Sequence, residues 1–299
     1  MPASRPPRRF AAPLLCEEGS FFLIGISCMS TVTRSQYLLI TDLDGTLIPP
    51  EWGDELRATM ERFARLVSRR DDVLLTYATG RDIGLALQGI GEHGLPEPQV
   101  LISEVGSAIY HCRDGAFHED PEYRDLMESA FGAGLRDRVP ERMSGMPGVE
   151  AQEASKQGRF KVSFYVAPDL PEARVRAMAA QALGPVGSEV SLVFSIDPAD
   201  GGGLLDVIPA GVSKASAAHY LRERLGFRPE EVIYAGDNGN DTAALLAGFN
   251  AILVGNASGS LRSHLAAESR RRGLEDRLYC AEAAYVSGVL EGCARFGLL

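Results

Sequence analysis

The sequence predicts an α/β protein, built on a doubly wound parallel sheet with an α+β domain inserted into it. Short apolar runs alternate with segments of helical periodicity over most of the chain, and strands separated by helices pair in parallel. The middle departs from this rhythm, because residues 161–166 alternate as an antiparallel strand with one wet face does. With 299 residues, 45% hydrophobic and 23% charged, the chain can bury a sizeable core.

The main domain is expected to be formed by two separate stretches of the chain, residues 37–114 and 201–299. In the first stretch, strands are expected at 37–40, 73–77 and 100–102, and helices at 54–69 and 82–90. In the second, strands are expected at 204–208, 231–235 and 251–254, and helices at 213–225, 241–247 and 285–296. Each strand is a short apolar run, and each helix has apolar residues at helical spacing.

The inserted domain is expected at residues 115–200. Its strands are predicted at 161–166 and 192–196, and its helices at 123–138 and 171–183. Residues 1–36 fit neither domain. They are rich in Pro and Arg at the start, and two glutamates stand where a signal peptide would have its apolar centre. We expect a disordered extension or a misassigned start, with Met29 as an alternative initiator.

Charge and cysteine content limit the partners. The formal net charge of −10 disfavours nucleic acid and anionic membranes, which attract basic surfaces. No apolar run reaches the ~18 to 20 residues that a membrane span needs. The five cysteines are widely spaced without a CxxC pair, which indicates reduced thiols and a cytoplasmic protein. We expect a small-molecule partner and a monomer or small homo-oligomer.

The first motif is Asp42-Leu43-Asp44-Gly45-Thr46, directly after the strand at 37–40. Two carboxylates at this spacing suit covalent catalysis, because one can attack phosphorus while the other handles the leaving-group proton. Gly45 allows the sharp turn that brings both into one site. Taken alone, the motif is also compatible with a solvated Asp-Gly turn.

Two further motifs are weaker. Thr79-Gly80-Arg81 follows the strand at 73–77, and a hydroxyl with bare N–H groups at a helix start can hold an anion. An ordinary threonine N-cap would look the same. Lys214 begins the helix expected at 213–225 and could neutralise a phosphate, although a lone lysine is usually a surface charge.

The fourth motif is Gly236-Asp237-Asn238-Gly239-Asn240-Asp241, after the strand at 231–235. Hard oxygen ligands at a strand end suit Mg²⁺, which takes one or two carboxylates and keeps several waters. Asp237 and Asp241 are four residues apart, so a helix starting here would present both on one side. A polar loop is the alternative. The dinucleotide fingerprint GxGxxG is absent here.

In this order the four motifs resemble those of the haloacid dehalogenase (HAD) superfamily of phosphohydrolases, over nearly all of residues 37–296. The inserted domain is similar to the α+β (C2) cap of the IIB subgroup. Within that subgroup, residues 157–164, 205–211 and 284–291 resemble the sucrose-phosphate phosphatases. The resemblance implies a Mg²⁺-dependent phosphatase that acts on sucrose 6-phosphate or a related glycosyl phosphate.

The resemblance also implies a role for each matching residue. Asp42 would be the nucleophile, and Asp44 the general acid and base. The implied Mg²⁺ ligands are Asp42, the backbone carbonyl of Asp44, Asp237 and Asp241, the last ligating or orienting. Thr79, Gly80 and Arg81 would bind phosphate, Lys214 would neutralise it, and Asn240, Gln157, Lys161 and Ser163 would contact substrate.

One stretch departs from the sucrose enzymes. They read Val-Gly-Thr-Glu-Ile where this chain has Val105-Gly106-Ser107-Ala108-Ile109. The acidic residue is thus replaced by Ala108, and Glu104 lies just before the stretch. The sugar therefore stays open among sucrose, mannosylfructose, glucosylglycerol and glycosyl glycerate phosphates. Two other functions stay open as well. One is a sugar phosphomutase or phosphotransferase, and the other a catalytically silent sugar-phosphate-binding module, although silent relatives would be expected to lose Asp42 or Asp44.

Overall fold

The computed structural model describes residues 36–131, 135–197 and 201–299. The expectations for residues 1–35 therefore lie outside the described residues. In the described part the main sheet has eight strands in the order β12-β11-β10-β1-β2-β3-β4-β5. These are β1 (Tyr37–Thr41), β2 (Val73–Ala78), β3 (Val100–Ser103), β4 (Ala108–Arg113), β5 (Ala116–Glu119), β10 (Val232–Gly236), β11 (Asn250–Leu253) and β12 (Leu278–Cys280). All pair in parallel except β4 and β5, which form an antiparallel hairpin at one edge.

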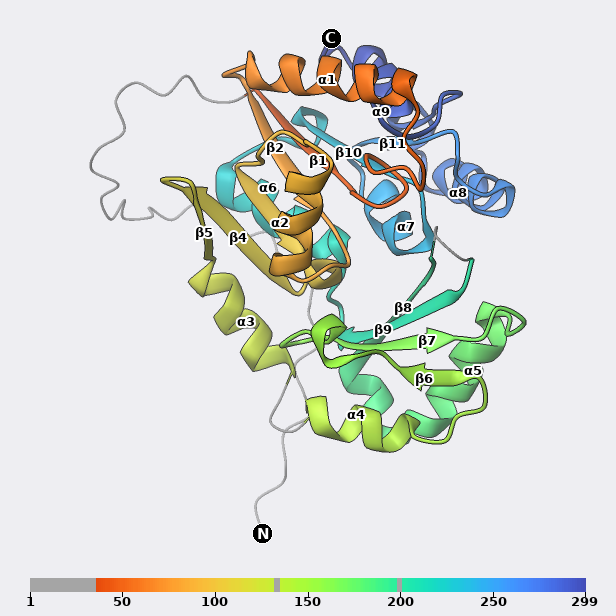
Figure 1. Cartoon of the computed structure of the whole chain (residues 1–299). Coiled ribbons are helices and arrows are strands. Elements are labelled where there is room, and N and C mark those ends of the chain that lie inside the picture. Colours follow the sequence, from red (N-terminus) through yellow and green to blue (C-terminus); the bar gives the residue numbers. More distant parts are fainter. Residues whose placement is uncertain (1–35, 132–134, 198–200) are drawn as a thin grey trace. The chain divides into compact units, whose positions relative to one another are not determined.

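Helices cover both faces of this sheet, as the expected doubly wound fold requires (Figure 1). Successive residues of β1 show why. Leu38 and Ile40 pack into one apolar core, and Leu39 packs into the other. The first core also receives α3 (Pro121–Phe131), α6 (Lys214–Leu225), α7 (Thr242–Leu245) and α8 (Gly259–Arg272). The second receives α1 (Asp54–Ser68), α2 (Ile83–Glu92) and α9 (Tyr285–Arg295). A strand buried on both faces needs an uninterrupted apolar run, which is what the sequence has.

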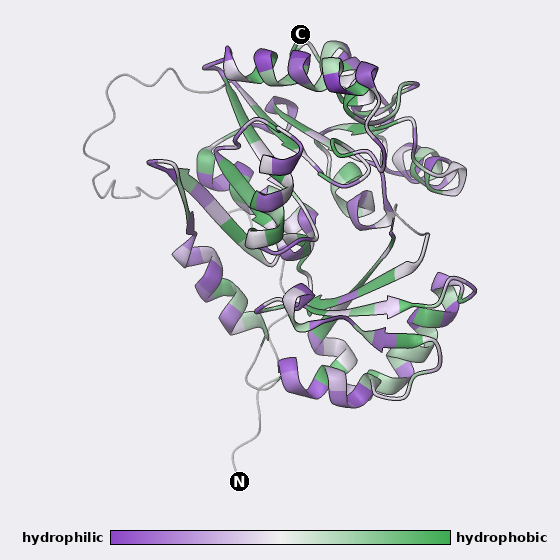
Figure 2. Ribbon diagram, viewed as in Figure 1, coloured by the Kyte–Doolittle hydropathy of each residue, from purple (hydrophilic) through white to green (hydrophobic). Residues whose placement is uncertain are grey.

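A second sheet has four antiparallel strands in the order β6-β7-β9-β8. These are β6 (Val149–Ala151), β7 (Val162–Val166), β8 (Val190–Ile196) and β9 (Gly203–Pro209). The helices α4 (Leu135–Met143) and α5 (Glu172–Leu183) pack against it (Figure 1). Val162, Phe164 and Val166 face this core, so Ser163 and Tyr165 lie on the other face. Figure 2 shows hydrophobic residues gathered on the strands and hydrophilic ones along the helices.

The structure corrects three details of the expected organisation. The strand predicted at 204–208 belongs to the second sheet, where Leu205 pairs with Phe164 and Phe194, and not to the main domain. Conversely, β5 extends the main sheet, although it lies past the expected boundary at residue 115. The helical pattern at 123–138 forms two helices, α3 and α4, separated by residues 132–134, which include Gly132 and Gly134. An apolar pattern gives the type of an element, but pairing between distant segments gives its sheet.

Other elements were not expected from the sequence. They are the β4–β5 hairpin, β6, α8 and β12. The helix expected at 241–247 is the short α7, preceded by a 3₁₀ turn at Gly239–Asp241. Among the residues described, no helix combines the length and the apolar character required to cross a membrane.

Candidate active site

The four motifs meet at one edge of the main sheet. Strands β2, β1 and β10 are parallel neighbours, so their carboxyl ends lie side by side. Asp42 follows β1, Thr79 follows β2, and Asp237 follows β10. Helix α6 begins at the same place with Lys214, and its capping box between Ser213 and Ser216 fixes this start. Ligands bind at this edge in open α/β sheets.

Lys214 is the centre of the cluster. Its side chain is 0% exposed, and its Nζ lies 2.8 Å from Asp42 Oδ1 and 2.8 Å from Asp241 Oδ1. Burial alone would lower the pKa of Lys214, but the two carboxylates outweigh it and hold the pKa above its ordinary value. The lysine is therefore charged. Because it is buried, the alternative of an ordinary surface lysine does not apply.

Three carboxylates lie close together around this lysine. Asp42, Asp237 and Asp241 each offer an oxygen, and these atoms lie within 4.8 Å of one another. Burial, and then the Asp241 charge, raise the pKa of Asp42, while Lys214 lowers it in part. The same two causes raise the pKa of Asp237 to about 7. Crowded buried carboxylates need positive charge, and their oxygens are the ligands that Mg²⁺ prefers. The residues present therefore fit a magnesium ion.

Asp241 is held by its surroundings. Its Oδ1 accepts from Lys214 and from the Tyr234 hydroxyl at 2.7 Å, and its Oδ2 accepts from the N–H groups of Asp237 and Asn238, both at 3.1 Å. With both oxygens engaged and the side chain fully buried, Asp241 fits the orienting role better than that of an open ligand. The nearby Asn240 Oδ1 accepts from Lys214 at 3.3 Å.

The loop after β1 is fixed against Asp237. Gly45 has φ +77°, and a Cβ there would lie 2.3 Å from Asp237 Oδ2, so the close approach requires glycine. The Thr46 hydroxyl donates to Asp237 Oδ1 at 2.8 Å, and Asn256 donates to the Gly45 carbonyl at 2.7 Å. These contacts bring the first and fourth motifs together.

Arg81 contacts Asp44 and so departs from the expected phosphate contact. The guanidinium donates from Nε to Asp44 Oδ2 at 2.8 Å and from Nη2 to Oδ1 at 2.6 Å. The Thr79 hydroxyl accepts from the Arg81 N–H at 3.1 Å, which shapes the turn at Gly80. Arg81 therefore bears on the predicted general acid directly.

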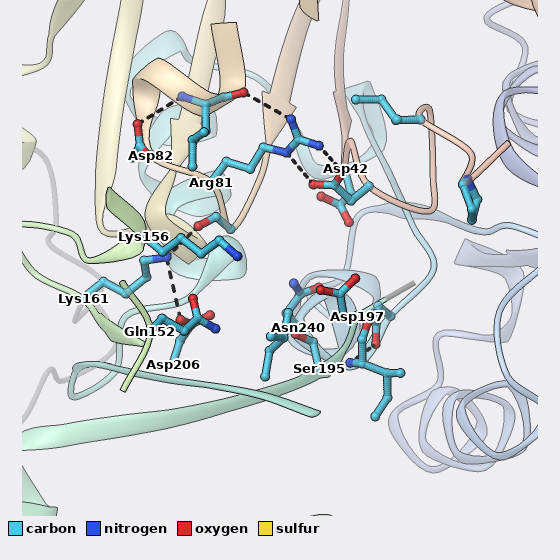
Figure 3. A pocket seen from close by; sticks show the side chains of 18 of the residues that line it. Asp42, Arg81, Asp82, Gln152, Lys156, Lys161, Ser195, Asp197, Asp206 and Asn240 are labelled. Atoms are coloured by element: carbon cyan, nitrogen blue, oxygen red, sulfur yellow. Dashed lines mark hydrogen bonds and ion pairs between the residues drawn. The ribbon is translucent and has the colours of Figure 1, made fainter. Parts of the chain in front are cut away.

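A cavity of about 710 Å³ opens above this edge. Asp42, Asp44, Gly80, Arg81 and Asn240 line it from the main domain. Its far side is lined by residues of the second sheet and its loops, namely Gln152, Lys156, Lys161, Ser195, Leu204 and Asp206. Figure 3 shows Lys156, Lys161, Gln152 and Asp206 across the cavity from Asp42 and Arg81. Polar side chains therefore line the cavity on both sides, among apolar ones.

The substrate contacts expected from the second domain are only partly in the cavity. Lys161 lines it, but Gln157 and Ser163 do not. The Gln157 amide donates to the carbonyls of Gln152 and Ser163 and accepts from the Ser163 N–H. The Ser163 hydroxyl donates to Asp206 at 2.5 Å. Both side chains thus support the fold of the loop that carries Lys161.

Sequence reasoning missed several cavity residues, among them Gln152, Lys156 and Asp206. Asp206 had a signal in the sequence, because it is the one carboxylate in the apolar run of β9. Its pairing in register with Ser163 is seen only in the structure. Gln152 and Lys156 lie in a loop without regular periodicity, so no pattern pointed to them.

Comparison with known proteins agrees with this geometry. A family model described as sucrose-6F-phosphate phosphohydrolase matches residues 35–297. A HAD-like hydrolase of Nitrosococcus oceani is 32% identical over 273 residues, covering 88% of this chain and 72% of the relative. Sucrose-phosphatase 1 of Nicotiana tabacum is 25% identical over 272 residues, covering 89% of this chain.

The structures agree as well. The sucrose-phosphatase of Synechocystis sp., solved with sucrose and phosphate, superposes with a TM-score of 0.73 at 28% identity, covering 87% of this chain and 98% of that one. The chain spans only 60% of the length of the tobacco enzyme. The match of the family model over residues 35–297, together with these relatives, shows that the chain belongs to the sucrose-6F-phosphate phosphohydrolase family, among the phosphoric monoester hydrolases of the HAD superfamily.

Proposed function

We propose that this protein is a Mg²⁺-dependent phosphatase of a small sugar phosphate, and that it works through an aspartyl-phosphate on Asp42. The observation that carries this proposal is the position of Asp42. Its side chain is 6% exposed, lies 2.8 Å from the Lys214 ammonium, and borders a cavity large enough for a sugar phosphate. A nucleophile beside a fixed cation suits a dianionic phosphate.

Mg²⁺ would be held by the carboxylates of Asp42 and Asp237 and by the Asp44 carbonyl. Asp241 would orient these ligands. The ion supplies positive charge at the phosphate oxygens. The protein's own contribution is to hold the acceptor and donor groups in place. Lys214 offers a second cation to the same oxygens, and the Thr79 hydroxyl and the Gly80 N–H offer hydrogen bonds, whereas the Thr79 N–H donates to the Ile102 carbonyl at 2.9 Å.

The reaction proposed has two displacements. An Asp42 oxygen attacks phosphorus, the bond from phosphorus to the sugar oxygen breaks, and Asp44 gives that oxygen its proton. Asp44 then takes a proton from a water molecule, which attacks phosphorus and releases phosphate from Asp42. The two jobs need two carboxylates, because the Asp42 oxygen is forming its bond to phosphorus while the leaving group departs.

Arg81 has a place in this scheme through Asp44. The paired hydrogen bonds of the guanidinium fix the carboxylate plane, so Arg81 sets the direction in which Asp44 meets the leaving oxygen. Arg81 is thus a positioning residue rather than the phosphate contact expected from its motif.

The second sheet and its loops would act as the specificity cap. Lys161, Asp206, Gln152 and Lys156 face the cavity and offer the charged and amide groups that bind sugar hydroxyls. The sucrose and phosphate bound to the Synechocystis relative support a glycosyl phosphate as the class of substrate. A cytoplasmic location and a monomer or small homo-oligomer stay predictions.

Phosphate release from a panel of sugar monophosphates, each with Mg²⁺ and with EDTA, tests the proposal. We expect metal-dependent release from sucrose 6-phosphate or from another glycosyl phosphate of the panel. Transfer of the phosphate to a second sugar hydroxyl would instead indicate a mutase or transferase. Absence of metal-dependent release from every member would contradict the proposed activity.

A further inference from the structure

The loop between β3 and β4 has an unusual backbone. Glu104 has φ +52° and Val105 has φ +60°, so two successive residues with side chains are left-handed. For a β-branched valine this is a true outlier, and such strain persists only where the surroundings hold it. Here the Glu104 N–H donates to the Arg81 carbonyl at 2.9 Å, and the Val105 N–H donates to the Thr79 carbonyl at 3.0 Å. These two hydrogen bonds thus hold the strained loop against residues 79–81, which form the turn proposed to bind phosphate (the phosphate turn).

The side chain of Glu104 points from the main domain toward the segment that precedes β7. It is only 7% exposed, and its Oε2 accepts from the Ser107 hydroxyl at 3.4 Å. Burial raises the pKa of Glu104, and the Lys161 charge and the nearby backbone N–H groups of Phe160 and Arg159, just before β7, offset part of that rise. A buried carboxylate is retained only where such donors satisfy it.

The packing around this carboxylate leaves no room. A Cβ added at Gly158 would lie 2.0 Å from Glu104 Oε2 and 2.5 Å from its Cδ. Gly158 is buried and its φ is not in the left-handed region, so glycine is needed there for the space that Glu104 occupies rather than for its backbone. The absence of a side chain at Gly158 therefore makes room for the carboxylate that Glu104 extends from the main domain.

The same short segment carries Lys161. Its side chain is 6% exposed, and its Nζ donates to the Gly80 carbonyl at 2.9 Å and lies 3.7 Å from Asp206 Oδ1. Residues 158–161 thus contact the main domain twice, through Glu104 and through Gly80. Both contacts lie beside the turn that is proposed to bind phosphate.

We infer that Glu104 is a positioning residue for sugar recognition. Its carboxylate holds residues 158–161 and so places Lys161 in the cavity, beside Asp206 and next to the phosphate turn. This role rests on the proposed function. It also explains why this loop differs in sequence from that of the sucrose enzymes, because the Glu104 carboxylate contacts residues 158–161 of the second domain rather than the substrate.

The inference separates two kinds of substrate. A sugar phosphate needs the cap residues, whereas acetyl phosphate is too small to reach them and reports on Asp42, Lys214 and the metal alone. Loss of the Glu104 contact is therefore expected to raise KM for the sugar phosphate by roughly 10- to 100-fold, the range for lost hydrogen bonds to a charged group. Turnover of acetyl phosphate is expected to stay within about twofold.

The variants are Glu104→Ala, Glu104→Gln, Gly158→Ala and the double variant Glu104→Ala/Gly158→Ala. Glu104→Gln keeps one acceptor oxygen and is expected to lose less than Glu104→Ala. Gly158→Ala is expected to match Glu104→Ala, because its methyl displaces the carboxylate. The double variant is expected to be close to Glu104→Ala, because without the carboxylate the added methyl meets only Lys161 Cβ, at 3.0 Å. Glu150→Ala and Gly187→Ala are controls, since Glu150 is exposed and a Cβ at Gly187 meets only Leu183 Cβ at 3.7 Å.

Amide hydrogen exchange of the full chain gives a readout that needs no substrate. Exchange at Arg159 and Phe160 is expected to quicken in Glu104→Ala and Gly158→Ala but not in the controls. Equal losses on both substrates, additive effects in the double variant, or unchanged exchange would each overturn the inference. If exchange responds as expected while the wild type releases phosphate from acetyl phosphate but from no sugar phosphate, the proposed substrate class fails, and the role in sugar recognition with it.

Discussion

Arg81 and Asp44 form a two-pronged ion pair, with Nε 2.8 Å from Oδ2 and Nη2 2.6 Å from Oδ1 of the carboxylate. Planar pairing of this kind fixes direction as well as distance. Because Arg81 is engaged by the proposed general acid, the charge of a bound phosphate would be left to Lys214 and the proposed metal ion. The pair therefore links the second motif to proton transfer.

A glycine beneath Arg81 offers a test of this pair. A Cβ at Gly89 would lie 2.3 Å from Arg81 Nη1, so Gly89→Ala is expected to push the guanidinium off Asp44. We expect kcat for a sugar phosphate to fall by roughly 10-fold or more, within the range of general acid catalysis. Acetyl phosphate, whose leaving group needs no proton, should be affected less. Gly91→Ala on the same helix meets nothing within 4 Å and is the control. Equal kinetics of the two variants would argue against the role of Arg81.

Lys214 is expected to stabilise the metal-free protein. Lys214→Met leaves Asp42 and Asp241 buried without their shared cation, and removing one partner of a buried ion pair costs about 3–5 kcal/mol. Urea unfolding in EDTA measures this loss. Arg65→Met, which breaks an exposed pair with Glu61, should change the free energy of unfolding by less than about 1 kcal/mol. A Lys214 variant as stable as the Arg65 variant would show that the carboxylates repel one another little.

The raised pKa of Asp237 predicts how stability depends on pH. Its value of about 7, against 3.8 ordinarily, means that the folded protein binds this proton more tightly than the unfolded chain. The resulting stability is complete below pH 3.8 and is lost as the pH rises through about 7. In EDTA the melting temperature should therefore fall between about pH 5 and pH 8.

Mg²⁺ should reverse this trend, because it binds the deprotonated carboxylates. The rise in melting temperature on adding Mg²⁺ should be larger at about pH 8 than at about pH 5. Asp237→Asn should flatten the dependence measured in EDTA. A metal-free protein whose stability is the same at both pH values, or whose Asn variant keeps the wild-type slope, would contradict the crowding of these carboxylates.

Gln157 and Gln152 are expected to respond oppositely to substitution. Gln157 makes three hydrogen bonds to the backbone, so Gln157→Ala should lower the free energy of unfolding by roughly 1–3 kcal/mol. Gln152 lines the cavity, so Gln152→Ala should raise KM for a sugar phosphate with a smaller effect on stability. Thermal melts and KM values for both variants check this. The reverse pattern would restore the substrate role that the sequence suggested for Gln157.

The sequence was sufficient for the central strands of the main sheet and the motifs that follow them, for a physical reason. Strands β1, β2 and β10 are buried on both faces, so they appear as unbroken apolar runs, and parallel pairing then brings Asp42, Thr79 and Asp237 to one edge. The cap residues depend on contacts between distant segments. Asp206 faces Ser163 only because β9 pairs with β7, and local periodicity does not report such pairing.

Local sequence patterns also do not show which side chains contact one another. Gln157 and Lys161 are four residues apart, yet one binds backbone and the other faces the cavity. Arg81 reaches Asp44 across 37 residues of sequence, which no spacing rule foresees. The role of Glu104 required knowing that Gly158 lies against it.

The proposed phosphatase reaction depends on attack of Asp42 on phosphorus. Loss of activity in Asp42→Asn is expected but would not separate a nucleophile from a metal ligand, since Asp42 lies in the carboxylate cluster. The stereochemistry at phosphorus does separate them. A thiophosphate ester of the sugar, made chiral with oxygen isotopes, would be hydrolysed in isotopically labelled water. Two displacements through Asp42 predict retention of configuration. Inversion would mean direct attack by water and would contradict the account.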